Sequence, residues 1–171
     1  MPGRIYMLIG LARSGKSTIA KAWGERRCYI KNGSLIYGLD SGPFIPRVVV
    51  NADQIRLTLH GKRFCAEKEE EVWRLENFIL RNFFNAGYHV LADETHTSNR
   101  GLMGVLRIDI DADYYVVDTP VGECKRRAIA CGHEDLVTRG IIDRMDEHWS
   151  DWKNNPGPYI DKLRAEVKKE R

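Results

Sequence analysis

The most informative stretch of this chain is Gly10-Leu11-Ala12-Arg13-Ser14-Gly15-Lys16-Ser17-Thr18. It has the spacing of a phosphate-binding loop, in which a glycine and four further residues precede Gly-Lys-Ser. The apolar run before it, residues 5–9, predicts a buried strand, and residues 17–23 predict a helix after it. In this context the loop amides surround an anion, and the N-terminus of the helix adds partial positive charge. All nine residues are therefore candidate nucleotide-binding residues.

Lys16 and Ser17 have the residue types that this chemistry requires. The Lys16 ammonium would reach the β- and γ-phosphates of a nucleoside triphosphate, and the Ser17 hydroxyl would take one Mg²⁺ position. Gly10 and Gly15 allow backbone conformations that other residues resist. An ordinary glycine-rich turn does not need all these features in register, so we interpret the stretch as a nucleoside triphosphate site.

Length and composition set the broad class of the protein. The 171 residues suit a single domain, and the net charge of +3 permits an anionic substrate without requiring a nucleic acid. No apolar run approaches the roughly 20 residues of a membrane span, and the N-terminus does not resemble a signal sequence. We therefore expect a cytoplasmic protein with no membrane partner. The four cysteines are scattered, which argues against disulfides and a zinc site.

Strands and helices are expected to alternate along the chain. The expected strands are residues 5–9, 47–51, 88–92 and 114–117, and the expected helices are residues 17–23, 53–60, 66–86, 98–107, 123–131 and 139–152. This alternation predicts an α/β fold with a parallel sheet and helices on both of its faces. Two β-prone runs around Asn32-Gly33 predict a hairpin. Residues 154–158 predict a turn, and the charged tail from residue 159 predicts a surface helix or a frayed end.

Functional side chains gather at the carboxyl ends of parallel strands, and two candidates follow the second strand. Asp53 and Arg56 are three residues apart at the start of the expected helix, so they share one face. A carboxylate there can accept a hydroxyl proton, and a guanidinium beside it can bind a phosphate through two hydrogen bonds. The spacing is equally consistent with a helix cap at Asp53 that pairs with Arg56 on the surface.

Asp93 closes the third strand, at the position from which an acidic residue holds Mg²⁺ in P-loop proteins. It is a candidate metal ligand together with Ser17, although it could instead cap the helix that follows. Glu94 could face either the metal or solvent, and we interpret His96 as a hydrogen-bonded loop histidine.

A basic cluster, Lys125-Arg126-Arg127, lies in the expected helix after the last strand. Such a cluster is usually a solvated face, but phosphoryl transfer requires cations near the developing charge, which a lid can deliver. Arg126 and Arg127 point about 100° apart on a helix, so only one of them is expected to face the phosphates.

Other candidates have structural interpretations. We expect a solvated loop for Asp109, Asp111 and Asp113, and packing for Trp149 and Trp152.

Together these motifs resemble the P-loop kinase domain of the bacteriophage polynucleotide 5′-kinases and their bacterial relatives, over residues 5 to 145. The resemblance rests on residues 10–18, 51–56 (NADQIR), 93–95 (DET) and 123–127 (ECKRR) before Gly132. It implies a kinase-type P-loop NTPase fold with a helical lid at about residues 121–140. It also implies ATP and Mg²⁺ as cofactors and the 5′-hydroxyl end of DNA or RNA as the acceptor substrate.

The same resemblance implies the roles of individual residues. Asp53 would be the general base, Arg56 would bind the acceptor's neighbouring phosphate, and Asp93 would position Arg56 or the metal. Lys16 and Arg127 would act on the transferred phosphate, Arg127 being the best lid match and Arg126 a second nucleotide-binding candidate. The chain departs from the family where Cys131 replaces a second lid arginine, where Arg13 replaces a small residue, and where residues 28–46 form an apparent insertion.

Two other functions fit the same motifs. A small-molecule kinase of similar architecture would phosphorylate a nucleoside, sugar or antibiotic hydroxyl in a closed pocket. A nucleotide-dependent switch or ATPase would position a water molecule, a role open to Glu94, and would not need Arg56 for an acceptor. The sequence leaves the oligomeric state open, including a homo-oligomer.

Overall fold

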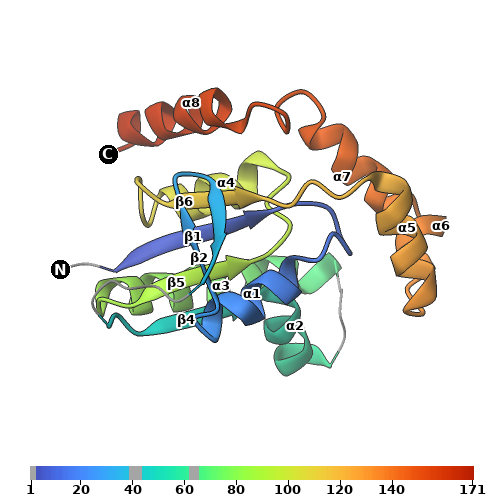
Figure 1. Ribbon diagram of the computed structural model, residues 1–171, viewed down its shortest axis with the longest axis horizontal. Coiled ribbons are helices and arrows are strands. Elements are labelled where there is room, and N and C mark those ends of the chain that lie inside the picture. The colour runs from blue at the N-terminus through green and yellow to red at the C-terminus, as the bar shows by residue number, and fades with distance from the viewer. Residues whose placement is uncertain (1–2, 39–43, 62–65) are drawn as a thin grey trace.

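A computed structural model of the chain describes residues 3–38, 44–61 and 66–171. Its main sheet has four parallel strands in the order β4-β5-β1-β6 (Figure 1). These strands are β4 (Arg47–Asn51), β5 (His89–Asp93), β1 (Arg4–Ile9) and β6 (Asp113–Val116). The predicted parallel α/β sheet is therefore confirmed, with each strand within one residue of its expected bounds.

The two faces of the sheet are covered by different elements. Successive side chains of a strand point to opposite faces, so Met7 joins the larger core whereas Leu8 joins a second, smaller core. The elements that supply the larger core include α3 (Glu69–Asn85), α4 (Asn99–Leu106) and α8 (Pro156–Lys169). The smaller core is supplied by α1 (Lys16–Gly24) and by β2 of a two-stranded hairpin. Helices on both faces were expected, and both faces have them.

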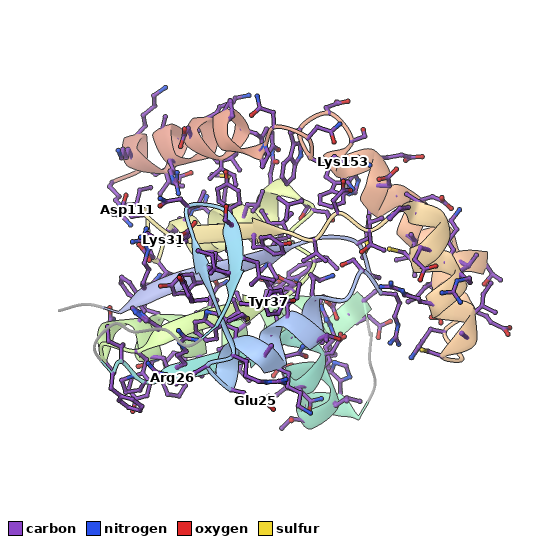
Figure 2. The ribbon with its side chains drawn as sticks, in the orientation of Figure 1. Glu25, Arg26, Lys31, Tyr37, Asp111 and Lys153 are labelled. Carbon is purple, nitrogen blue, oxygen red and sulfur yellow. The ribbon has the colours of Figure 1, made fainter. Side chains whose placement is uncertain are left out.

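The hairpin consists of β2 (Cys28–Lys31) and β3 (Ser34–Tyr37), as the Asn-Gly pair predicted. Asn32 and Gly33 both have positive φ angles, 51° and 75°, which a tight two-residue hairpin turn requires. Lys31 and Tyr37 lie at opposite ends of this hairpin (Figure 2). Of the loop expected after it, residues 39–43 lie outside the described part of the chain.

The expectation of a solvated loop around Asp109 and Asp113 is wrong, because both carboxylates are buried. Asp109 accepts hydrogen bonds from the backbone amides of Ile5 (2.9 Å) and Asp111 (3.0 Å). Asp113 accepts from both turn amides of the hairpin, at 2.9 and 3.1 Å. A buried carboxylate needs donors in place of water, and these amides provide them. Asp113 thereby attaches the hairpin turn to the first residue of β6, away from the P-loop edge.

The C-terminal segment belongs to the core and is neither frayed nor a simple surface helix. Helix α8 begins at Pro156, within the expected turn, because proline suits the first helical position. Its buried residues Ile160, Leu163 and Val167 recur at helical spacing and join the larger core. Trp149 and Trp152 also pack in this core, as expected from the sequence.

The remaining helices are α2 (Ala52–His60), the 3-10 turn η1 (Ala66–Lys68), α5 (Val121–Ala130), α6 (Asp135–Thr138) and α7 (Ile141–Trp149). The helix expected over residues 139–152 is α7, which starts later because Gly140 has a left-handed conformation, with φ of 61°. The segment expected to act as a lid, residues 121–140, contains α5 and α6. These helices lie with α7 beyond the end of the sheet toward which β1 points (Figure 1).

Within the described ranges, no helix combines the length and the apolar character that a membrane crossing would need. Among the described residues, Cys28, Cys124 and Cys131 have free thiols. The fourth, Cys65, lies outside the residues that the structure describes.

Candidate active site

The P-loop connects β1 to α1 at the carboxyl edge of the sheet. Gly10 permits a close approach there, since a Cβ atom on it would lie 2.8 Å from the Ser14 hydroxyl and 2.9 Å from the Val117 carbonyl oxygen. Gly15 has a left-handed conformation, with φ of 106°, immediately before α1 begins at Lys16. The local geometry explains why glycine is needed at both ends of the loop.

Lys16 is buried inside this loop. Its Nζ donates hydrogen bonds to the carbonyl oxygens of Gly10 (3.0 Å) and Leu11 (2.6 Å). Burial lowers the pKa of Lys16 from its usual 10.5 to about 8, while the negative charge of Asp93 opposes the shift. The ammonium is thus desolvated in advance, and an anion bound in the loop would have a strong interaction with it.

Asp93 ends β5 opposite Asn51, the last residue of β4. The Asn51 side chain donates to Asp93 Oδ2 (2.7 Å) and accepts from the amide of Gln54 (3.0 Å), which makes Asn51 the N-cap of α2. Asp53 is therefore not the cap, which removes one alternative for that residue. Asp93 is not a cap either, because the N-cap residue of α4 is Ser98. We did not single out Asn51 from the sequence, although asparagine between a strand and a helix is a capping signal.

Arg56 is held between two carboxylates. Its NH1 donates to Asp53 Oδ1 (2.8 Å), while Nε and NH2 donate to the buried Glu69 at 2.9 and 2.7 Å. These contacts use one hydrogen on each nitrogen, and a guanidinium carries five, so NH1 and NH2 each keep one for a further acceptor. The Asp53 side chain is 63% exposed, whereas that of Arg56 is largely covered.

Glu69 and Glu76 are two site residues that sequence reasoning missed. The acidic start of α3 has a sufficient explanation in the helix dipole, so nothing distinguished Glu69 from its neighbours. Glu76 is 4% exposed, and its Oε1 has no hydrogen-bond partner within the described residues. Burial, and then the charge of Glu94, raise the pKa of Glu76 from 4.5 to about 9, against the opposing effect of Arg56. Burial and the neighbouring carboxylates thus favour the protonated, neutral form of Glu76.

The loop after β5 supports the P-loop from one side. The carbonyl oxygen of Thr95 accepts a hydrogen bond from the Gly10 amide at 3.0 Å. His96 is buried, with Nδ1 3.1 Å from the Leu8 carbonyl oxygen and Nε2 3.8 Å from a Glu94 carboxylate oxygen. The interpretation of His96 as a hydrogen-bonded loop histidine agrees with these contacts.

Of the two adjacent arginines of α5, Arg127 faces the P-loop. Its NH1 lies 3.4 Å from the carbonyl oxygen of Ser14, and its Nε donates to Glu123 at 2.6 Å. Arg126 is 71% exposed and pairs with the same Glu123 carboxylate. Hydrogen bonds from Arg126 and Arg127 lower the pKa of Glu123 to about 2. Lys125 instead pairs with Asp143, at 2.6 Å, and so links α5 to α7.

These residues converge on one region at the carboxyl edge of the sheet. The carboxylates of Asp93, Asp53 and Glu94 all act on the charge of Lys16. Within the described residues no three acidic, histidine or cysteine side chains form a metal centre of their own. Mg²⁺, however, needs only one or two protein ligands beside phosphate oxygens and water. Asn51 donates to Oδ2 of Asp93, and no hydrogen bond from another described residue occupies Oδ1, so the donor set fits a metal shared with a nucleotide.

In this protein the P-loop follows β1, an inner strand of the parallel sheet, and an arginine from a helical segment faces the loop. This arrangement is the one found in P-loop kinases, and the protein has that fold. The chain belongs to the AAA domain family (AAA_33), which matches residues 5–150. None of the curated proteins compared with it gives a significant match.

Solved structures of similar fold include a chain in the Pnkp1/Rnl/Hen1 RNA repair complex, with a TM-score of 0.67 and 19% identity. The similarity covers 90% of this chain and 46% of that chain, so this protein spans about half the length of that relative. A second structure of the Pnkp1/Rnl/Hen1 complex has a TM-score of 0.56 and 24% identity, over 74% and 39% of the two chains. The Mycobacterium tuberculosis APS kinase CysC, in complex with AMPPNP and APS, has a TM-score of 0.51 and 20% identity, over 74% and 69%. At these identities the similarity concerns the fold.

Proposed function

We propose that this protein is an ATP- and Mg²⁺-dependent kinase that transfers the γ-phosphate to the 5′-hydroxyl end of a nucleic acid. The arrangement of Asp53, Arg56 and Glu69 is the observation that carries the proposal. In it, the exposed Asp53 carboxylate lies beside the Arg56 guanidinium, which Glu69 binds through Nε and NH2. The guanidinium keeps two hydrogens that can bind an incoming phosphate. An acceptor with a hydroxyl and a neighbouring phosphate matches both groups.

The donor nucleotide would occupy the P-loop. Backbone amides of residues 10–18 would surround its phosphates, and Lys16 would exchange its contacts with loop carbonyls for contacts with phosphate oxygens. Arg127 already reaches the loop carbonyls, so it would lie close to the charge that develops on the transferred group. Arg126, which points to solvent, would contribute less.

Ser17 and Asp93 would hold Mg²⁺ together with the nucleotide. The bound ion would neutralise charge on the β- and γ-phosphate oxygens as the phosphoryl group is transferred. Asn51 would keep the Asp93 carboxylate in place through its contact with Oδ2.

Asp53 would accept the proton of the 5′-hydroxyl as its oxygen attacks the γ-phosphorus. The new bond joins this oxygen to phosphorus, and the bond between phosphorus and the β,γ-bridging oxygen breaks, so ADP leaves. Arg56 would bind the phosphate next to the hydroxyl and thereby orient the acceptor. Polynucleotide ends carry such a phosphate, whereas free nucleosides and sugars do not, and this supports a nucleic-acid acceptor over a small molecule.

The direct test offers γ-labelled ATP and Mg²⁺ to the protein with separate acceptors: a 5′-hydroxyl oligonucleotide, nucleosides, sugars and APS. Label on the oligonucleotide alone is expected, and Lys16→Met should abolish it. Label on a nucleoside, on a sugar or on APS would favour the small-molecule kinase. Label released as inorganic phosphate without any acceptor would favour an ATPase or switch.

A further inference from the structure

The face of α3 that holds Arg56 continues beyond the proposed catalytic residues. Glu69, Trp73 and Glu76 are spaced by four and three residues, so their side chains follow one another along one side of the helix. Glu69 binds Arg56, and Glu76 is also within the electrostatic reach of Arg56. Trp73 therefore lies between Glu69 and Glu76 on the same side of α3, about one helical turn (about 5.4 Å) from each of them.

The guanidinium of Arg100 lies over the ring of this tryptophan. Its guanidinium carbon is 3.8 Å from the centroid of the Trp73 ring, and Arg100 is exposed whereas Trp73 is half-buried. One turn further along both helices, Gly104 packs against Asn77, where a Cβ on the glycine would lie 3.3 Å from Asn77 Oδ1. At this second contact α4 approaches α3 closely, one turn from the Arg100–Trp73 pair.

Helix stability does not explain an arginine at this position. Arg100 is in the first turn of α4, where the helix dipole favours an anion and disfavours a cation. The turn has no acidic residue, and Ser98 makes no side-chain cap bond. Among the residues that the structure describes, no carboxylate lies within ion-pair distance of Arg100. Stacking on a ring also leaves the in-plane N–H donors of a guanidinium open to a phosphate.

We propose that Arg100, supported by Trp73, binds a second phosphate of the acceptor strand, further from the reacting end than the one at Arg56. This inference rests on the proposed function and deepens it. Arg56 binds Glu69 and Arg100 lies over Trp73, and these two residues are one helical turn apart along α3, about 5.4 Å. The two arginines therefore follow one another along α3, in the order in which successive phosphates of a bound strand would meet them. Glu94, whose carboxylate lies beside Gly101, would keep the phosphate on the outer side of Arg100. The substrate class is then an oligonucleotide with several phosphates.

A series of acceptors of increasing length tests this inference. The wild-type protein is expected to prefer a trinucleotide or hexanucleotide over a nucleoside 3′-phosphate. Arg100→Gln should lower kcat/KM about tenfold for the long acceptors and leave the nucleoside 3′-phosphate unchanged. Trp73→Leu, which keeps apolar bulk but removes the ring, should cost about twofold to fivefold for the same long acceptors. Arg81→Gln removes an equal charge from an exposed position two turns along α3 and is the matched control.

Binding without transfer distinguishes failure of this inference from failure of the proposed function. The anisotropy of a 5′-hydroxyl hexanucleotide labelled at its 3′ end gives Kd as a function of salt. Arg100→Gln should weaken binding and reduce the slope of log Kd against log salt by about one, and Arg81→Gln should do neither. If phosphate transfer to oligonucleotides is absent but this dependence on Arg100 holds, only the proposed function fails. Equal loss with every acceptor, or no loss with any, would overturn the second phosphate site, as would a hexanucleotide that does not bind.

Discussion

Arg56 acquires its geometry from a residue thirteen positions further along the chain. The Glu69 carboxylate holds Nε and NH2, so the guanidinium is fixed in place before any ligand arrives. A planar, fixed group loses less conformational freedom on binding than a free side chain does. The same contact keeps Arg56 from being a simple surface partner of Asp53.

Replacement of Arg56 should separate acceptor binding from donor binding. Arg56→Ala is expected to raise KM for a 5′-hydroxyl oligonucleotide tenfold or more, because a charge-assisted contact is worth about 1.5–3 kcal/mol. KM for ATP should change little, and Arg56→Lys should recover only part of the loss. Steady-state kinetics with both substrates checks this. An unphosphorylated nucleoside is the control acceptor, and equal damage with it would assign Arg56 a structural or ATP-binding role.

Asp53→Asn should lower kcat by about 10²–10⁴-fold without reducing ATP affinity, because an amide cannot accept the hydroxyl proton. Since Asn51 caps α2, this change should leave the thermal midpoint nearly unaltered. Single-turnover rates and thermal unfolding measure the two effects separately. A wild-type rate combined with a lowered midpoint would show that Asp53 only stabilises the helix.

Lys16 should take up a proton when nucleotide binds. Its pKa of about 8 in the free protein leaves it half-protonated near pH 8, and a bound polyphosphate favours the charged form. Calorimetry in buffers of different ionisation enthalpy should then detect about half a proton per nucleotide at pH 8. Nucleotide affinity should fall as pH rises above 8. Unchanged proton uptake in Lys16→Met would contradict this assignment.

At the scale of elements, α3 is the helix that joins the core to the proposed acceptor site. Val72 and Leu80 are buried in the larger core, while Glu69 and Glu76 lie on the side that meets Arg56. Burial of an uncharged glutamic acid is tolerated here because a neutral carboxyl avoids most of the desolvation cost of a carboxylate. Burial of Glu76 therefore lowers the stability of the fold, although it places a polar group near the site.

Glu76 gives the free energy of unfolding a specific pH dependence. Between pH 4.5 and about 9 the folded protein keeps this proton and the unfolded chain releases it, so stability falls as pH rises through that window. Glu76→Gln, which is neutral throughout, should remove this dependence and raise stability at pH 7 by about 1–3 kcal/mol. Urea unfolding at several pH values measures it. A parallel pH dependence in wild type and variant would refute the assignment.

At the scale of the whole molecule, the sheet lies between two cores on its opposite faces. The N-terminal part of the chain supplies a strand of the sheet, and the C-terminal part supplies a helix of the larger core. Strand β1 lies inside the sheet, whereas α8 closes the larger core from the C-terminal end (Figure 1). Arg164 of α8 also donates to the carbonyl oxygens of Ile110 and Ala112, just before β6. The last helix is thus integral to the fold.

Leu163→Ala should destabilise the whole domain by about 2–5 kcal/mol, because this side chain is fully buried in the larger core and its loss leaves a cavity. Lys162→Ala, at the exposed neighbouring position, should change stability by less than about 0.5 kcal/mol. Denaturant unfolding of both variants measures the difference. Similar small effects would mean that α8 is only loosely attached.

Local patterns were sufficient to predict the P-loop, the four parallel strands and the Asn32-Gly33 hairpin. Each depends on residues close together in the chain, whose spacing restricts the backbone and the face on which side chains lie. The position of Asp93 at the end of a strand followed in the same way. The resemblance to polynucleotide kinases added roles to these residues, and those roles stay predictions.

The contacts that shape the site come from residues far apart in sequence, so no local pattern could reveal them. Asn51 and Asp93 are 42 residues apart, and Arg56 and Glu69 are 13 residues apart. A carboxylate such as Glu69 or Glu76 looks like any other on a helix until packing decides which one is buried. Local spacing restricts the backbone, whereas burial and partner choice depend on how the whole chain packs, and the folded structure alone contains that information.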